Sequence, residues 1–536
     1  MTIPFLFPLD LTFSDITQTN IKPNLSIMAV PSSLKGSAEQ ISVGSSFGVG
    51  IDKNGKVHQW GVFPASFEAK LSNVPAGIGK IKLISAGLDH VIAFTEDGKI
   101  YTWGDDRMNL SSIPPETEGK NIVQMEAGHQ ISTALDDKGN LYVWGNENFI
   151  SIIPGEYQGR IKQYALNITT ALAILDDGSV VCLTNKEVPF SYVPASIGND
   201  AFMLASTDKC VAALKNDGTA VVWGSIDYGE DNVPAEIQGH IKFITAGRNH
   251  FTAILDDGSV SSWGRNDKGQ LDAPKLTGVK FVEAGYYQNY AIDTTGNVSA
   301  WGLKGYLMGS DQHGRDIALR LIYAGRLSMT VGAISVIILG IIGVLIGGIS
   351  GYYGGTADML LMRLAEIVNS IPFYPLAIIL SAIIGNRLTD TGRVILIMFI
   401  LGILNWPGLA RLARAQILAE RENEYVTAAR SVGIKEFIII FRHILPNILP
   451  VVLVTLTLSL ASSILLESSL SFLGFGVREP NPTWGNMLYS CVDATVISVY
   501  WWRWVFPAIA LSLSVLSINT VGDGFRDAID PRSNDR

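Results

Sequence analysis

The chain divides into two stretches with different patterns of hydrophobic and polar positions. Up to about residue 303, short apolar runs of alternating character are separated by glycine turns, which is typical of antiparallel strands. From about residue 327 onward, long apolar runs carry very little charge, and each is long enough for a helix that crosses the ~30 Å hydrocarbon core of a bilayer. The pattern therefore predicts an all-β domain followed by an all-α membrane domain.

The first stretch contains seven copies of one repeat of about 40 residues. Each copy has a proline, then a turn glycine, and in six copies Trp-Gly follows five residues after that glycine; the fourth copy has Leu183-Thr184 in its place. These tryptophans are Trp60, Trp103, Trp144, Trp223, Trp263 and Trp301. One such unit cannot bury its apolar face, but seven arranged radially can, with the tryptophan between neighbours. Residues 24–303 are therefore predicted to form a seven-bladed β-propeller.

The second stretch contains five predicted membrane spans, at residues 327–349, 359–384, 394–412, 448–473 and 504–521. The first span includes five small residues that allow helices to approach closely in lipid, namely Gly332, Gly340, Gly343, Gly347 and Gly348. Two acidic residues, Glu366 and Glu467, fall inside predicted spans, where charge is costly. We expect them to bond between helices or to anchor a loop, with a substrate contact as the alternative.

Charge separates the two stretches further. The whole chain has a net charge of −9 and is 48% hydrophobic and 17% charged, against about 25% charged residues in typical soluble chains. Residues 24–303 hold 21 Lys and Arg against 31 Asp and Glu, so the acidic character belongs to the predicted propeller. Nucleic acid is therefore not expected as a partner.

The sequence gives no sign of a catalytic centre. Cys182, Cys210 and Cys491 lack the spacing of a disulfide framework or a zinc site, and His90 and His250 occupy a repeat position that packing residues fill in other copies. Residues 50–57 resemble a phosphate-binding loop, but Val57 replaces the required hydroxyl. We expect no enzyme activity, cofactor or metal, because paired carboxylates and a nucleophile motif are also absent from the sequence.

The repeats carry the pattern Ala-Gly…His…Asp-Gly…Trp-Gly, for example from Ala246 to Gly264. This pattern resembles the repeats of the regulator of chromosome condensation, in the short bacterial form also found in a propeller-type β-lactamase inhibitor protein. The resemblance implies the propeller fold. It implies no single function, because the functions of that family range from nucleotide exchange to inhibitor binding.

A loop at about residues 414–446 separates the third and fourth predicted spans. Its charge distribution favours a helix that begins near Glu424 and ends at Gly433, followed by an apolar run up to a helix-stopping proline, Pro446. The loop resembles the coupling loop of ABC importer permeases, the Glu-Ala-Ala…Gly…Ile-x-Leu-Pro motif. The matching residues are Ala428, Ala429, Gly433, Leu445 and Pro446. Thr427 and His443 replace the Glu and Ile of the motif; taken alone, the loop also fits a basic segment at lipid headgroups.

Other segments carry the same resemblance. The stretch with Gly309, Asp311, Gly314, Arg315 and Asp316 resembles the segment before the second helix of oligopeptide and dipeptide permeases, whose nickel branch shares these motifs. Residues 469–487 and 522–532 resemble later segments of the family, and residues 4–23 resemble the stretch after its first helix. We therefore expect a missing first helix upstream, a permease remnant at 1–23, the inserted propeller at 24–303, a linker at 304–326, the permease domain at 327–524 and a cytosolic tail at 525–536.

The resemblance implies a multi-pass permease subunit of an ABC importer in the plasma (inner) membrane, for oligopeptides, dipeptides or similar small solutes. The implied partners are a second permease subunit, two ATPase subunits, an extracytoplasmic solute-binding protein and membrane lipid. Three predicted spans separate the propeller from the coupling loop, so we expect the propeller outside, where it docks the binding protein or gates the entrance. The alternative is a membrane-anchored propeller receptor or binding module that retains a permease domain only as a non-transporting relic.

Overall fold

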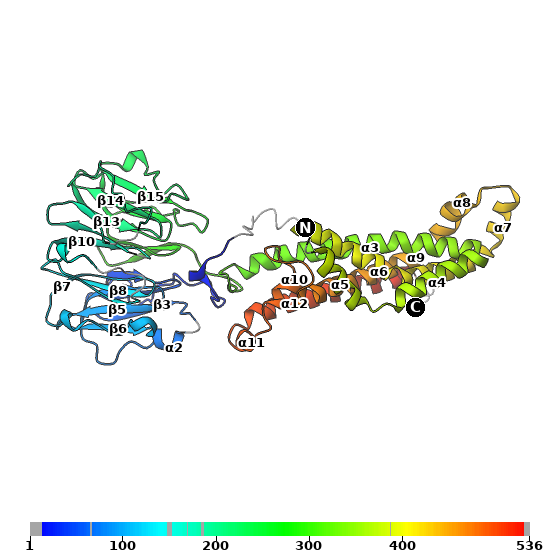
Figure 1. Cartoon of the computed structure of the whole chain (residues 1–536), viewed down its shortest axis with the longest axis horizontal. Coiled ribbons are helices and arrows are strands. Elements are labelled where there is room, and N and C mark those ends of the chain that lie inside the picture. Colours follow the sequence, from blue (N-terminus) through cyan, green and yellow to red (C-terminus); the bar gives the residue numbers. More distant parts are fainter. Residues whose placement is uncertain are drawn as a thin grey trace. The chain divides into compact units, whose positions relative to one another are not determined.

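A computed structural model of the chain describes residues 13–64, 67–146, 153–168, 170–183, 187–385 and 387–529. It divides into two compact units, residues 15–314 and a second unit that combines residues 1–14 with residues 315–536; Figure 1 labels their elements. The first twelve residues of the expected permease remnant lie outside the described part, as does the expected tail from residue 530 onward.

Within the described residues, the first unit contains seven three-stranded antiparallel sheets, each built from strands consecutive in the chain. The first strands of the sheets are β1 (Ala38–Val43), β4 (Ile81–Ala86), β7 (Ile122–Ala127), β10 (Ile161–Leu166), β13 (Ala201–Ser206), β16 (Ile241–Ala246) and β19 (Val279–Ala284). The middle strands are β2 (Phe47–Asp52), β5 (His90–Thr95), β8 (Ile131–Asp136), β11 (Ala171–Leu175), β14 (Cys210–Lys215), β17 (His250–Leu255) and β20 (Gln288–Asp293). The third strands are β3 (Val57–Gly61), β6 (Ile100–Gly104), β9 (Leu141–Gly145), β12 (Val180–Cys182), β15 (Ala220–Gly224), β18 (Val260–Gly264) and β21 (Val298–Gly302).

The turn glycines and the repeated tryptophans explain this regularity. In all seven sheets the glycine between the middle and third strands has a φ between +72° and +89°, a conformation that other residues adopt only with strain. The tryptophans are buried, and four of them donate an indole N–H to a backbone carbonyl that precedes the first strand of their own sheet, as Trp263 does to Glu230 at 2.9 Å. In the fourth sheet, where Leu183 replaces the tryptophan, β12 has three residues.

The last sheet packs against the first, so the seven sheets close into a ring. Lys280 on β19 pairs with Glu39 on β1 at 3.1 Å. The indole of Trp60 donates to the hydroxyl of Tyr290 on β20 at 3.1 Å. The prediction of a seven-bladed propeller is confirmed. The chain also enters and leaves the ring at one place, because Asn24 donates its backbone N–H to Tyr306 at 2.9 Å.

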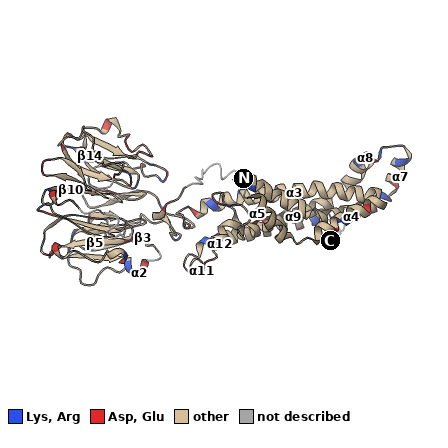
Figure 2. Ribbon diagram, viewed as in Figure 1, with Lys and Arg blue, Asp and Glu red and all other residues tan. Residues whose placement is uncertain are grey.

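The short helical segments described in the first unit are η1 (Ile16–Gln18), α2 (Glu68–Leu71), η2 (Arg107–Asn109), η3 (Pro115–Thr117), η4 (Gly155–Tyr157) and η5 (Ala235–Ile237). The helices of the second unit are α3 (Ile317–Tyr353), α4 (Gly355–Ser370), α5 (Phe373–Gly385), α6 (Asp390–Arg421), α7 (Glu424–Ser431), α8 (Glu436–Ile438), a π-helical turn (Ile439–Ile444), α9 (Leu445–Phe472), α10 (Trp484–Tyr489), α11 (Ala494–Val499) and α12 (Trp502–Ile529). Figure 2 shows the middles of the long helices almost free of charged residues.

Four helices of the described chain are long and apolar enough to cross a membrane, or five spans exist if the bent pair α4 and α5 counts as one. The span predicted at 359–384 corresponds to this bent pair, in which α4 and α5 meet at 79°. The cause is Pro372, whose ring disfavours the helical conformation of the preceding residue. Ile371 has φ −80° and ψ 125°, an extended conformation that ends α4.

Helices α3 and α6 run parallel and pack along much of their lengths. The hydroxyl of Ser335 bonds the carbonyl of Met398 at 3.2 Å. Twelve residues further along both helices, a Cβ on Gly347 would lie 2.5 Å from the carbonyl oxygen of Ala410. The close packing expected of the α3 glycines is confirmed here, because any side chain at Gly347 would separate the helices.

Candidate functional site

Residues 424–446 form a helical hairpin between α6 and α9. The first arm is α7, which ends at Gly433 with a φ of +78°, while the backbone N–H groups of Val432 and Ile434 bond the carbonyls of Ala428 and Ala429 at 3.1 Å. This is the glycine-ended helix that the sequence predicts. Nothing lies within 4 Å of a Cβ built on Gly433, so conformation rather than space favours glycine there.

The second arm of the hairpin differs from the sequence-based expectation. Pro446 does not stop a helix, because it lies in the first turn of α9, and the chain is helical from Glu436 to Phe472. The π-helical turn Ile439–Ile444 precedes Pro446 and contains His443, which is half-buried.

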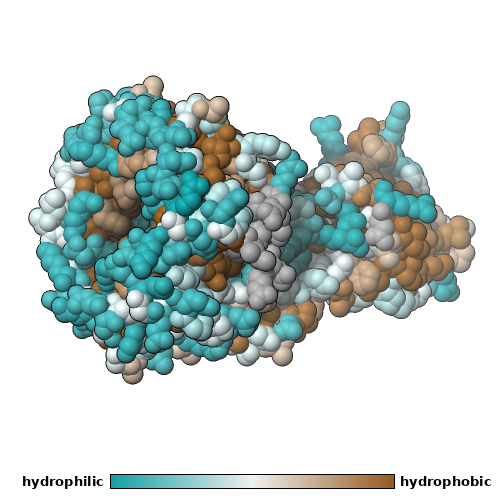
Figure 3. Space-filling model, turned by 60° about the vertical axis from the view of Figure 1, so that its left-hand side comes forward, coloured by the Kyte–Doolittle hydropathy of each residue, from teal (hydrophilic) through white to brown (hydrophobic). Residues whose placement is uncertain are grey.

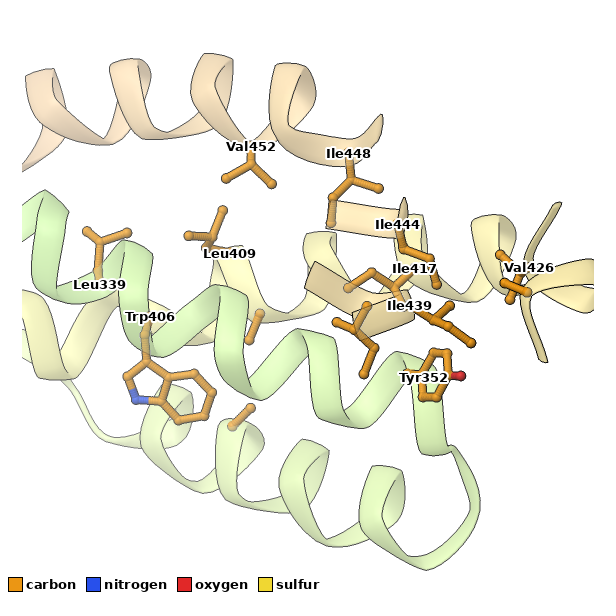
Figure 4. Close-up of a cluster of buried hydrophobic side chains, with 14 residues drawn as sticks. Leu339, Tyr352, Trp406, Leu409, Ile417, Val426, Ile439, Ile444, Ile448 and Val452 are labelled. Carbon is orange, nitrogen blue, oxygen red and sulfur yellow. The ribbon is translucent and has the colours of Figure 1, made fainter. Parts of the chain in front are cut away.

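The base of the hairpin is part of the hydrophobic core of the second unit. Val426 on α7 and Ile439 and Ile444 in the π-helical turn are buried against Ile417 of α6 and Tyr352 of α3. Figure 4 shows these side chains between the ends of the long helices. Because four elements meet in one cluster, a displacement of the hairpin must move the ends of α3, α6 and α9 as well.

The tip of the hairpin exposes apolar surface. Val432 is 81% exposed and Phe437 67% exposed, and the ring of Phe437 contacts the tilted ring of Phe441, with centroids 4.4 Å apart. The motif residues Glu424, Thr427 and Ala428 are also exposed, whereas Ala429 is buried. A protruding apolar tip of this kind is typical of a surface that another protein covers.

Polar contacts tie the first arm to α3. The guanidinium of Arg430 lies over the ring of Tyr352 at 5.0 Å, and its Nε donates to the Tyr352 hydroxyl at 3.3 Å. From the end of α6, Arg421 donates to the backbone carbonyl of Tyr352 at 3.2 Å. The sequence did not single out Tyr352 or Arg430 as site residues, although Arg430 lies inside the loop that resembles the coupling loop and Tyr352 lies just after the first predicted span.

A second pair of charges, also not singled out from the sequence, joins α4 to α6. Arg414 contacts both carboxylate oxygens of Asp358, through Nε at 2.5 Å and Nη2 at 2.6 Å, and the hydroxyl of Ser350 donates to the same carboxylate. Asp358 and Arg414 each lie just outside a predicted span. Opposite charges at the ends of neighbouring spans were the signal that could have identified this pair.

The two acidic residues predicted inside spans lie in different surroundings. Glu467 is fully buried in α9 and accepts hydrogen bonds from Ser471 at 2.7 Å and from Ser328 of α3 at 2.9 Å. Glu366 is not buried in the chain: its side chain is 59% exposed on α4 and pairs with Arg363 at 2.8 Å. Its position three residues after Arg363 places the two charges on one helix face and accounts for the pair.

The predicted motif residues 309–316 have structural roles. Gly309 and Gly314 have φ values of +79° and +72°, and Asp311 accepts the backbone N–H of His313 at 2.8 Å, so this segment is a series of turns. Asp316 caps the N-terminus of α3 by accepting the N–H of Ala318 at 2.8 Å. In the same unit, Arg315 donates to Glu479 at 2.8 Å.

The propeller histidines also pack within the ring. His90 is fully buried and its Nε2 bonds Ser132 of the next sheet at 2.9 Å; His250 does the same with Asn289 at 2.8 Å. Burial lowers the pKa of both imidazoles to about 4, so both are neutral at pH 7. No group of three or more His, Cys, Asp or Glu side chains within the described residues could hold a metal ion.

Both units are similar to known proteins. Residues 343–535 match the model of the binding-protein-dependent transport system inner membrane component, and residues 81–109 and 241–270 match the regulator of chromosome condensation repeat. The oligopeptide transport system permease protein OppC of Haemophilus influenzae is 41% identical over 231 residues, or 43% of this chain and 72% of the relative.

Two further proteins are similar to parts of the chain. The dipeptide transport system permease protein DppC of Bacillus subtilis is 38% identical over 224 residues, or 42% of this chain and 68% of the relative. Among solved structures, the CRINKLY WD40 ectodomain of the Arabidopsis thaliana receptor kinase ACR4 is 17% identical and superposes with a TM-score of 0.40, over 50% of this chain and 96% of that chain.

Proposed function

The chain belongs to the family of peptide transport permeases, inner membrane components of binding-protein-dependent transport systems, and on that premise we propose that it couples ATP hydrolysis on partner subunits to the movement of small peptides across the membrane. It is a multi-pass membrane protein and a transport subunit. The observation that carries the proposal is the hairpin of residues 424–446, with an apolar tip exposed at Val432 and Phe437 and a base buried among the ends of α3, α6 and α9.

The hairpin would act as the contact for a cytosolic ATPase subunit. Its tip offers apolar surface that a groove on a partner could cover, and its base shares one core with three long helices. When two ATPase subunits close on ATP, they would press on the hairpin of this chain and of a second permease subunit. The parallel pair α3 and α6 would then move as a rigid body and change the side from which the cargo path is open.

A substitution at the hairpin tip tests this contact. Val432→Asp introduces charge into the exposed apolar tip without touching the buried base, so we expect loss of ATPase subunit co-purification and at least a tenfold fall in ATP-dependent peptide uptake by proteoliposomes. Tyr192→Asp, at a 74% exposed position in the propeller, is the matched control for an added exposed charge and should leave co-purification of the ATPase subunits unchanged. Normal uptake with Val432→Asp would contradict the proposed contact.

The direction of the helices supports a proposed sidedness of the chain. Because α3 and α6 are parallel, the chain has to return across the membrane between them, and the bent pair α4 and α5 supplies that return. Three crossings then separate residue 316 from residue 422. With the hairpin in the cytosol, we propose that the propeller is extracytoplasmic, on the side from which an extracytoplasmic solute-binding protein would deliver its cargo.

We further propose that the propeller docks the solute-binding protein or gates the entrance to the permease. Its place in the chain supports this. Asn24 and Tyr306 form an antiparallel β-bridge, so the ring can be inserted between them without moving the flanking segments apart. Deletion of residues 25–305, with Asn24 joined to Tyr306 through a short glycine linker, should lower peptide uptake at least tenfold while the ATPase subunits still co-purify. Unchanged uptake would favour a propeller that serves another ligand.

A further inference from the structure

The centre of the propeller encloses a cavity of about 450 Å³, lined by residues from the first strand of every sheet. Figure 3 shows a hollow at the centre of the ring with apolar residues inside it. A volume of this size is typical of sites for small organic ligands. The proposed transport function makes no use of this cavity, which lies wholly within the first unit.

Side chains along a strand point to opposite sides in turn, so every second residue of each first strand faces the cavity. Two such residues on each strand form two layers around the cavity. The layer closer to the ends of the strands consists of small side chains at five of its seven positions and of glutamates at two. Its members are Ser42, Ser85, Glu126, Ala165, Ala205, Thr245 and Glu283. The small side chains leave space in this layer, and Glu126 and Glu283 are the two acidic residues that face that space.

Glu126 has a structural role that accounts for its presence. Its Oε2 accepts the backbone N–H of Leu166 on the next sheet at 2.7 Å, and its Oε1 accepts the side-chain amide of Gln124 at 2.8 Å. Ser42 and Ser85 accept backbone N–H groups of their neighbouring sheets in the same way, at 3.0 and 2.9 Å. Glu126 therefore joins neighbouring sheets as these serines do.

Glu283 is different. The hydrogen bond it accepts within the described residues is a long one, from the hydroxyl of Ser42 to Oε1 at 3.4 Å, and Glu283 is one of the residues that line the cavity. Burial and the nearby charge of Glu126 raise the pKa of Glu283 to about 8. The hydrogen bond from Ser42 lowers this pKa, but by less. A carboxyl group in such surroundings lacks a positive counter-charge.

The basic residue that lines the cavity is engaged elsewhere. Arg248 lies at one end, where its Nε bonds Asp208 at 2.9 Å and its Nη1 bonds Asp15 and, at 2.8 Å, the hydroxyl of Thr17. The segment of residues 15–18 is held at this end of the ring, since Gln18 also donates to the carbonyl of Ser45 at 2.9 Å. Ligand entry is thus expected at the other end.

That other end carries aromatic side chains. Phe243 and Phe281 lie two residues before Thr245 and Glu283 on their strands, and their ring centroids are 6.2 Å apart. Both rings line the cavity. The cavity therefore presents the aromatic pair of Phe243 and Phe281 and, next to it, the carboxyl group of Glu283, which lacks a positive counter-charge.

We propose that the propeller cavity binds a small organic cation, a primary ammonium compound whose charged group pairs with Glu283 and whose apolar part lies against Phe243 and Phe281. Charge-assisted hydrogen bonds of an ammonium to a carboxylate and contact with aromatic faces both favour such a ligand over a neutral or acidic one. The site is independent of the proposed peptide translocation.

Binding should depend on pH, because the cation requires the ionised form of Glu283. At pH 7 the free carboxyl is mostly protonated, so binding releases a proton and affinity rises from pH 6 to pH 8. The other titratable or charged groups along the cavity are Glu126, with a pKa raised by burial to about 7, Asp208, raised by burial to about 6, His129, lowered by burial to about 4, Tyr286 and Arg248. Ionisation of Glu126 over the same range acts in the same direction.

The test measures binding to the full chain, purified in lipid nanodiscs, by isothermal titration calorimetry with 2-phenylethylamine as the probe. We expect saturable binding of one probe per chain, and affinity at least about tenfold lower for 2-phenylethanol, which lacks the charge. Glu283→Gln should weaken binding of the amine by about tenfold or more, whereas the exposed Glu236→Gln should leave it unchanged.

A second variant keeps the result interpretable if Glu283→Gln disturbs the ring. Glu283→Asp retains the carboxyl group but shortens its reach, so its affinity should fall between those of the native chain and Glu283→Gln. Equal binding of the amine and the alcohol, no binding of the amine, or unchanged binding in folded Glu283→Gln would each overturn the proposal. Peptide uptake does not enter these measurements, so failure of the transport proposal would be seen separately.

Discussion

At the scale of single residues, the environment of a charged side chain decides its role more than its position in the sequence. Glu366 and Glu467 both fall inside apolar segments, yet Glu467 is fully buried among serines whereas Glu366 is exposed beside Arg363. The sequence placed both residues inside predicted spans but could not distinguish their surroundings. The surroundings of Glu366 depend on the bend at Pro372 between α4 and α5, which is a property of the backbone geometry. The glycine at 433 was predictable, since its role follows from local conformation alone.

Glu283 gives a stability prediction at this scale. Its pKa is raised to about 8 in the folded chain, above its ordinary value near 4.5, so the folded state loses stability as pH rises between these two values. Between pH 5 and pH 8 the melting temperature of the propeller, followed by tryptophan fluorescence, should fall by at least about 3 °C more in the native chain than in Glu283→Gln. The exposed Glu236→Gln should behave as the native chain does. An identical pH profile for Glu283→Gln would contradict the buried, ionisable state described here.

At the scale of elements, local patterns predicted the strands well and the helix junctions poorly. Each β-hairpin was predictable because its turn glycine and the alternating pattern of its strands both indicate a hairpin at the same residues. The junctions at Pro372 and Pro446 have opposite outcomes, since one proline breaks a span and the other lies inside the first turn of a long helix. Which outcome occurs depends on the packing of neighbouring helices, which a single proline does not encode.

The packing of α3 on α6 can be tested with two adjacent glycines. Gly347→Ala places a Cβ 2.5 Å from the backbone of Ala410, whereas Gly348→Ala meets Ile417 at an ordinary 3.8 Å. The first substitution should separate the helices, lower the melting temperature of the membrane domain by several degrees and reduce peptide uptake at least fivefold; the second should leave both near native values. Equal effects of the two substitutions would show that α3 does not pack on α6 along this face.

At the scale of the whole molecule, the proposed sidedness depends on the parallel direction of helices α3 and α6. The repeats predicted the ring, and the hairpin was predictable from its glycine and its motif. Three spans before the hairpin were predicted as well, but not the bend of the second one, in which α4 and α5 meet at 79°. The parallel contacts of α3 with α6, which join residues far apart in the chain, are what require a return between them.

The most direct test of the account is the accessibility of two engineered cysteines in intact cells. In a background with Cys182, Cys210 and Cys491 replaced by alanine, Ser111→Cys places a thiol on the exposed surface of the propeller and Val432→Cys places one at the hairpin tip. A membrane-impermeant maleimide should label the first in intact cells and the second only after permeabilisation. Labelling of both residues, or of Val432→Cys alone, in intact cells would contradict the proposed coupling of this permease to cytosolic ATPase subunits.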